Sequence, residues 1–154
     1  MKYKCLVLDH DDTIVNSTPT VNFPAFKKCL AKLRPDVNLE LEEYICYNFE
    51  PGLNRYYKEN NLPMPELIYG WECEPDQRKP AVWPIKQIME KLSLEPKDLV
   101  MIDDLKPGKT MADNAGIDFI GAGWSHSIPK ISSYMEKECK YYCKNVDELE
   151  KYIF

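Results

Sequence analysis

The chain has 154 residues, which fits one domain with a small insert, and its hydrophobic content of 44% is enough for a buried core. Its net charge of -5 argues against a general nucleic-acid binder, because neutralising phosphate groups requires clustered lysines and arginines. No apolar run approaches the length of a membrane span and no secretory signal is evident, so we expect a cytoplasmic protein without membrane contact.

The six cysteines favour reduced thiols in a cytosolic protein over disulfides or a zinc site. No two of them form a Cys-x-x-Cys pair, and neither of the two histidines has a cysteine at zinc-ligand spacing. The cysteines are Cys5, Cys29, Cys46, Cys73, Cys139 and Cys143.

The first predicted element is a short buried strand that ends in a cluster of carboxylates. Residues 4–8 are mainly apolar without strict alternation, which is typical of a strand covered on both faces. Asp9, Asp11 and Asp12 follow at once, and Thr13 comes next. Two carboxylates about 4 Å apart repel by about 4 kcal/mol at an effective dielectric constant of about 20, a cost that a hard cation or a shared proton removes. A ligand site is therefore favoured over the alternative, a turn in which aspartates cap backbone N–H groups.

A mostly helical segment follows the carboxylates. Asn16–Thr18 provide polar helix caps and Pro19 suits the first helical position, so a helix is expected to begin here and to end before Pro35. Further helices are predicted over residues 39–45 and 53–60. Because these helices interrupt the alternation of strands and helices, we expect them to form a small insert.

The remainder of the chain alternates between predicted strands and helices. Apolar runs bounded by turn residues predict strands, and apolar residues at helical spacing predict helices. The strands are expected at 66–71, 99–102, 117–122 and 141–143, the helices at 85–92, 110–115, 131–138 and 146–153, and a loop at 105–108. Such alternation predicts an α/β fold with a doubly wound parallel sheet. We therefore expect residues 1–17 and 61–154 to form the α/β core and residues 18–60 to be a small helical cap.

Charged residues far apart in the sequence fall just past predicted strand ends or in adjoining loops. They are Asp9, Asp11, Lys79, Asp103 and Asp104. Because the carboxyl ends of parallel strands meet at one edge of a sheet, these side chains are expected to converge. Carboxylate oxygens can hold Mg²⁺, one carboxylate can attack phosphorus, and a lysine can offset the charge of the transferring group. The sequence therefore indicates a magnesium-assisted phosphoryl-transfer site.

At these residues the chain resembles the haloacid dehalogenase superfamily. The first motif of that superfamily, an apolar strand followed by DxDxT, corresponds to Asp9–Thr13, and its third-motif lysine corresponds to Lys79, followed here by Pro80. The acidic residues of its fourth motif correspond to Asp103 and Asp104. The resemblance implies a Rossmann-like core, and the second aspartate of the first motif favours a phosphatase over a dehalogenase. A phosphomutase is a weaker alternative, because those relatives often lack the threonine of the first motif.

The resemblance also implies a role for each matching residue. Asp9 would be the nucleophile that forms an aspartyl-phosphate, and Asp11 would protonate the leaving alcohol and then activate water. Mg²⁺ would lie between the Asp9 carboxylate, the Asp11 carbonyl oxygen and Asp104. Asp103 stands where many members have glycine and would be an outer ligand of the metal, while Thr13 would hold the loop by hydrogen bonding.

Three further residues carry separate expectations. Lys79 would offset negative charge on the nucleophile and on the transferring group. His10 lies between two aspartates, and in an extended loop its side chain would point away from theirs, toward the cap and the substrate. Asp12 replaces a glycine that is common in the family, so the loop is expected to be stiffer or more acidic.

The second motif of the family, a Ser or Thr that ends a strand and binds phosphoryl oxygens, has no clear match. The best candidate is Asn48 after the apolar run 44–47, but the spacing favours loss of a whole strand–helix unit. Such a loss would leave the strand over residues 4–8 with exposed backbone donors and acceptors. Either residues 66–71 pair with that strand, or a second chain covers it, which predicts a homodimer or a strand-exchanged oligomer.

These observations predict a Mg²⁺-dependent phosphomonoester hydrolase that acts on a small phosphorylated substrate through an aspartyl-phosphate. Because the second motif is missing, the alternative is a catalytically weakened or inactive protein of this fold that serves as a binding or assembly module. No nucleic-acid partner is expected.

Overall fold

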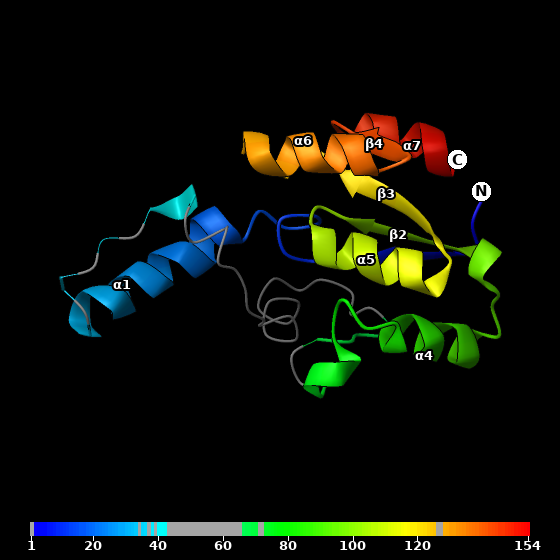
Figure 1. The fold of residues 1–154 in the computed structure, drawn as a ribbon, viewed down its shortest axis with the longest axis horizontal. Coiled ribbons are helices and arrows are strands. Elements are labelled where there is room, and N and C mark those ends of the chain that lie inside the picture. The colour runs from blue at the N-terminus through cyan, green and yellow to red at the C-terminus, as the bar shows by residue number, and fades with distance from the viewer. Residues whose placement is uncertain are drawn as a thin grey trace.

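The core of the protein is a parallel four-stranded sheet with strand order β1-β2-β3-β4 (Figure 1). The computed structural model describes residues 2–33, 35–36, 38, 40–42, 66–70, 73–125 and 128–154. The strands are β1 (Cys5–Leu8), β2 (Leu99–Asp103), β3 (Asp118–Ala122) and β4 (Tyr141–Cys143). This arrangement confirms the predicted α/β class and the parallel pairing, because helices connect β2 to β3 and β3 to β4.

Helices cover both faces of the sheet. The sheet therefore separates two apolar layers of the core. The helices are α4 (Trp83–Leu92), α5 (Lys106–Ala115), α6 (Pro129–Glu138) and α7 (Val146–Ile153). On one face, α4, α5 and α6 pack against side chains such as Leu99, Met101 and Phe119. On the other face, α7 packs through Ile153 against a layer that includes Ile102. Burial on both faces explains why β2 reads as a continuous apolar run in the sequence.

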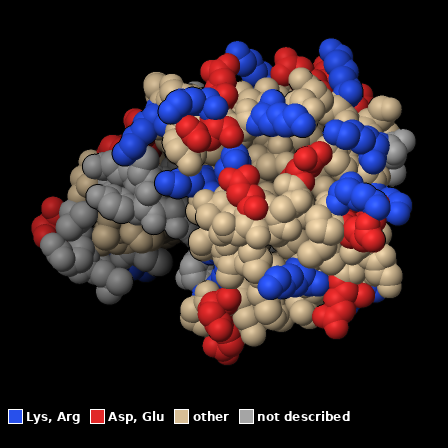
Figure 2. All heavy atoms as spheres, turned by 45° about the vertical axis from the view of Figure 1, so that its right-hand side comes forward, with Lys and Arg blue, Asp and Glu red and all other residues tan. Residues whose placement is uncertain are grey.

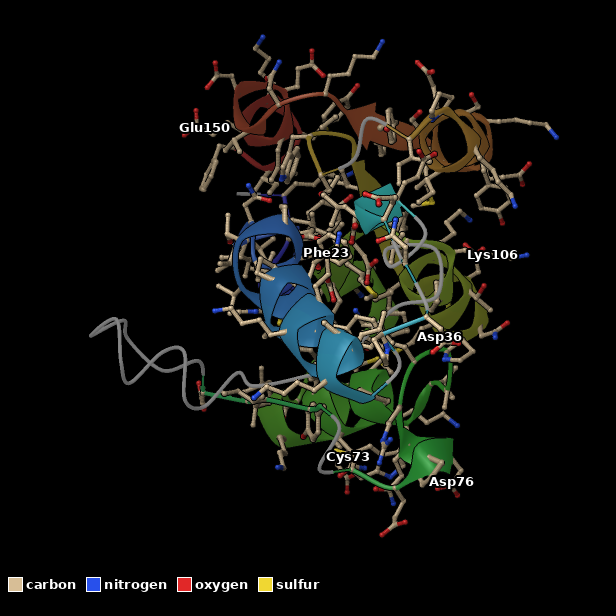
Figure 3. The ribbon with its side chains drawn as sticks, turned by 90° about the vertical axis from the view of Figure 1, so that its left-hand side faces the viewer. Phe23, Asp36, Cys73, Asp76, Lys106 and Glu150 are labelled. Carbon is tan, nitrogen blue, oxygen red and sulfur yellow. The ribbon has the colours of Figure 1, made fainter. Side chains whose placement is uncertain are left out.

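The chain leaves the sheet after β1 on the side toward which the carboxyl ends of the strands point. There η1, a short π-helical turn (Thr18–Asn22), leads into α1 (Phe23–Leu33), which projects from the core (Figure 1). Figure 3, viewed from that side, shows α1 in front of the core, with Phe23 at its beginning. The predicted helix over this segment is therefore confirmed. The predicted helices over 39–45 and 53–60 lie largely outside the described residues, and the division into core and cap stays a prediction.

The prediction of a strand over residues 66–71 is wrong for the part that the structure describes. Residues 66–70 form no strand. Leu67 and Tyr69 pack instead against the core layer beneath α4, and the Tyr69 ring lies edge-on to Trp83 with ring centroids 5.3 Å apart. Packing against this layer partly buries these alternating apolar side chains, so the alternation did not signal backbone pairing. Among the described strands, β1 pairs with β2 alone.

The helix predicted over 110–115 begins four residues earlier, so the loop expected at 105–108 is wrong. Leu105 is the N-cap of α5 in an extended conformation, and Pro107 occupies the first turn, where proline is well tolerated. The backbone N–H of Leu105 donates to the Asp103 carboxylate at 2.8 Å. The C-terminal end was predicted correctly, because Gly116 closes α5 in the left-handed conformation with φ 71°.

Two short 3₁₀ turns complete the described structure: η2 (Pro75–Gln77) precedes α4, and η3 (Pro96–Asp98) precedes β2. Among the described residues, no helix combines the length and the apolar character that crossing a bilayer requires. On the face drawn in Figure 2, basic and acidic side chains are interspersed over the described surface and form no single basic patch.

Candidate active site

The carboxyl ends of β1 and β2 bring three aspartates together. Pairing between the two strands continues one residue past β1, because the backbone N–H of Asp9 donates to the Ile102 carbonyl at 3.0 Å. Asp9, Asp103 and Asp104 each present one carboxylate oxygen, and these oxygens all lie within 4.8 Å of one another. The convergence expected from strand order is thus present for these three aspartates, although Asp9 is more than 90 positions from the other two in the sequence, and the Asp11 carboxylate is not part of this group.

Lys79 bridges two of these carboxylates. Its Nζ donates to Asp9 Oδ1 and, at 2.5 Å, to Asp103 Oδ2. Burial would lower the pKa of Lys79, but the nearby charges of Asp103 and Asp9 outweigh that effect and raise the pKa above its usual value. The ammonium group is therefore charged at neutral pH, and it partly neutralises the acidic cluster.

Asp103 is the most enclosed member of the cluster, with a side chain only 2% exposed. Its Oδ1 accepts the Leu105 N–H while its Oδ2 faces Lys79. Burial, assisted by the charges of Asp9 and Asp104, raises the pKa of Asp103 to about 7 in spite of Lys79. These contacts make Asp103 a partner of the lysine and of the first turn of α5, and its expected role as an outer metal ligand stays a prediction.

Gly108 provides the space that Asp103 occupies. A methyl group on Gly108 would lie 2.1 Å from Asp103 Oδ2 and 2.4 Å from its Cγ, far inside van der Waals contact. The aspartate at position 103, where the family often has glycine, thus depends on a glycine at 108 in the facing helix.

The loop after Asp9 folds back on itself at Asp12. Asp12 adopts a left-handed conformation with φ 59°, which aspartate tolerates better than most residues and which explains why glycine is common here. The Asp12 carboxylate accepts the backbone N–H of Thr18 at 3.1 Å, and the backbone N–H of Ile14 donates to the His10 carbonyl at 3.0 Å. The side chain of Asp12 therefore ties the loop to the start of η1.

The carboxylate of Asp11 points to Ser17 and His10. Ser17 Oγ, in a residue only 5% exposed, donates to Asp11 Oδ1 at 2.5 Å, and His10 Nδ1 lies 3.3 Å from the same oxygen. Burial opposes ionisation of Asp11, but the hydrogen bonds from His10 and Ser17 lower its pKa overall. The expectation that His10 points away from its neighbours is wrong, because the loop turns at Asp12 and is not extended. Contact of His10 with substrate stays a prediction.

Thr13 and Trp124 join the loops that follow β1, β2 and β3. Thr13 is 8% exposed, and its Oγ1 donates to Asp104 Oδ1 at 3.3 Å. Trp124, just beyond β3, donates its Nε1–H to the Thr13 carbonyl at 3.0 Å. The threonine thus makes a side-chain hydrogen bond across to the fourth-motif aspartate, while the indole fixes its backbone.

Sequence reasoning did not identify the supporting roles of Ser17, Gly108 and Trp124. Ser17 lies in a stretch that predicts helix caps. Its hydroxyl makes no capping hydrogen bond and donates to the Asp11 carboxylate instead. Gly108 and Trp124 had no local signal, because their partners lie on other elements. Asn48, the candidate for the second motif, lies outside the described residues.

Comparison with known protein families gives a match that agrees with the resemblance noted in the sequence. Residues 66–122 match the family described as haloacid dehalogenase-like hydrolase. The matched segment contains Lys79, Asp103 and Asp104, and Asp9–Thr13 precede it. No curated protein and no solved structure gives a significant match to the chain.

Proposed function

The chain belongs to the haloacid dehalogenase superfamily, with a hydrolase family match over residues 66–122, and from this premise we propose that it is a Mg²⁺-dependent phosphomonoester hydrolase. The observation that carries the proposal is the convergence of Asp9, Asp103 and Asp104 around Lys79 at the carboxyl edge of the sheet. Ligand sites of open α/β sheets lie at this edge.

Asp9 is the proposed nucleophile. Its side chain is 20% exposed, and Lys79 contacts Oδ1 of the same carboxylate, so Oδ2 is the oxygen proposed to attack the phosphoryl group. Attack of an Asp9 oxygen on phosphorus would break the ester bond and leave an aspartyl-phosphate, which water then hydrolyses. Lys79 would stabilise negative charge on the equatorial oxygens during both transfers.

Asp11 is the proposed acid and base. It would donate a proton to the departing alkoxide in the first step and accept one from water in the second. Ser17 and His10 hold Oδ1 of this carboxylate and favour its ionised form, which suits its role as base in the second step and opposes its role as acid in the first. Oδ2 of Asp11 would be the atom that donates and accepts this proton.

The donor set fits Mg²⁺, because this ion prefers carboxylate and carbonyl oxygens. Asp9 and Asp104, together with the Asp11 carbonyl oxygen, would hold the ion, and Asp103 would stay at its edge through its pairing with Lys79. When bound, Mg²⁺ would supply positive charge that offsets the phosphoryl oxygens.

Hydrolysis of p-nitrophenyl phosphate with and without Mg²⁺ tests the proposal. The wild-type protein is expected to require Mg²⁺, and Asp9→Asn to lose about 10³-fold or more of the rate. Asp76→Asn is a matched control, because Asp76, labelled in Figure 3, is an exposed carboxylate in η2 and is not one of the three clustered aspartates. Equal rates for wild type and Asp9→Asn would remove Asp9 chemistry from consideration.

The alternative is a protein that keeps the fold and the cation site without turnover. It is favoured by the position of β1 at the edge of the described sheet, since the second-motif hydroxyl would end a strand on that side. Binding of Mg²⁺ or beryllofluoride without hydrolysis of any phosphomonoester would support this alternative.

A further inference from the structure

Tyr142 of β4 fills a slot made by two glycines at the carboxyl end of β3. A methyl group on Gly121 would lie 2.8 Å from Tyr142 Cδ2, and one on Gly123 would lie 2.6 Å from its Cζ. The phenol ring therefore covers the backbone of β3 from Gly121 to Gly123, and its tip lies over Gly123, beyond the last strand residue. Any larger side chain at either glycine would displace the ring.

The register of the sheet places Tyr142 in one row with the acidic cluster. Asp103 pairs with Gly121, and Gly121 pairs with Tyr142, so the three residues are cross-strand neighbours. Residues in one such row point to the same face of a sheet. Because the middle residue has no side chain, the ring can lie over β3, between β4 and Asp103.

The hydroxyl of Tyr142 makes no hydrogen bond within the described part of the protein. The ring is half-buried, and among the described residues the phenol oxygen has no hydrogen-bond partner. Burial, together with the charges of Glu136, Cys139 and Asp104, raises the pKa of Tyr142, so the phenol is a neutral donor at physiological pH. The influence of Asp104 agrees with a position near the cluster.

We propose that Tyr142 is a specificity-determining residue whose hydroxyl binds the leaving group of the substrate. Adjacent strands lie about 4.8 Å apart, so the end of β3 is about 10 Å from the end of β1, where Asp9 would attack phosphorus. A group at that distance reaches the far end of a short leaving alcohol and does not reach the phosphoryl oxygens. The substrate class is therefore a phosphomonoester of a short polyhydroxy alcohol.

This inference rests on the proposed function, and two probes of equal chain length test it. Glycerol 3-phosphate carries hydroxyl groups on its leaving alcohol, and propyl phosphate carries none. Tyr142→Phe is expected to lower the ratio of kcat/KM for glycerol 3-phosphate over propyl phosphate by about 3- to 10-fold, mainly through KM, as expected for one hydrogen bond. Tyr141→Phe is the matched control, because it removes the same hydroxyl from the next residue, which packs on the opposite face beside Tyr152.

Calorimetric binding of both probes to the Asp9→Asn protein separates this inference from the proposed function. A wild-type protein without turnover would count against the hydrolase, yet a selective loss of glycerol 3-phosphate binding in Tyr142→Phe would still support the role of Tyr142. The inference is overturned if Tyr142→Phe and Tyr141→Phe change the ratio equally, if neither changes it, or if neither probe binds or is hydrolysed.

Discussion

Replacing Gly108 by alanine is expected to displace the Asp103 carboxylate from its contacts. The new methyl group would lie 2.1 Å from Oδ2, the oxygen that accepts from Lys79, and 2.8 Å from the Asp103 Cβ. Helix α5 cannot give way freely, because Met111 and Ala112 on the same helix are fully buried in the core. The carboxylate must therefore move, and its hydrogen bonds to Lys79 and Leu105 are weakened.

The expected cost follows from three opposing contributions. Overpacking of a filled site costs about 1–3 kcal/mol, and weakening a hydrogen bond to a charged group costs about 1.5–3 kcal/mol. Alanine gains up to about 1 kcal/mol over glycine in a helix. The net effect is a destabilisation of about 3 kcal/mol, equivalent to a Tm about 6–12 °C lower for a domain of this size.

Urea unfolding of a double-mutant cycle with Asp103→Gly checks this reasoning. Asp103→Gly removes the carboxylate and also the Cβ that would lie 2.8 Å from the new methyl group, so Gly108→Ala should be neutral or stabilising by up to about 1 kcal/mol in that background. An equal cost of Gly108→Ala in both backgrounds would refute the inference that Gly108 provides the space for the Asp103 carboxylate.

Three other properties follow from the described contacts. Ser17→Ala should lower the free energy of unfolding by about 1.5–3 kcal/mol, because the buried hydroxyl donates to the Asp11 carboxylate, whereas Thr20→Ala on the exposed part of η1 should have little effect in the same urea titration. Burial raises the pKa of Cys139 to about 11, so iodoacetamide at pH 8 should label this thiol only as fast as the protein unfolds, and rapid labelling of the native protein would contradict its burial. Because β1 pairs only with β2 among the described strands, we still expect a dimer, and light scattering from a monomer across micromolar concentrations would count against it.

The parts of the fold that the sequence predicted are those governed by local patterns. The apolar run ending at Asp103, the glycine that closes α5, and the periodicity of α7 all lie within a few residues of their signal. Residues 66–70 show the limit of such patterns, because alternating apolar side chains pack against a helix as readily as they pair in a sheet.

The same limit applies to the candidate site. Strand order alone indicates that Asp9 and Asp104 converge, since parallel strands share an edge. The contact of Ser17 with Asp11 depends on the turn at Asp12, and the position of Asp103 depends on a glycine in a neighbouring helix. Such contacts are set by the three-dimensional packing of separate elements, and no spacing in the sequence encodes them.

The covalent step at Asp9 can be measured directly by intact-protein mass spectrometry after an acid quench. The protein is mixed with p-nitrophenyl phosphate and Mg²⁺, and the Asp11→Asn variant is included because loss of the base should slow hydrolysis of the aspartyl-phosphate. We predict one phosphoryl adduct, mapped to Asp9, that accumulates in Asp11→Asn and is missing from Asp9→Asn. An adduct on another residue, or product formation by Asp9→Asn at the wild-type rate, would contradict the account.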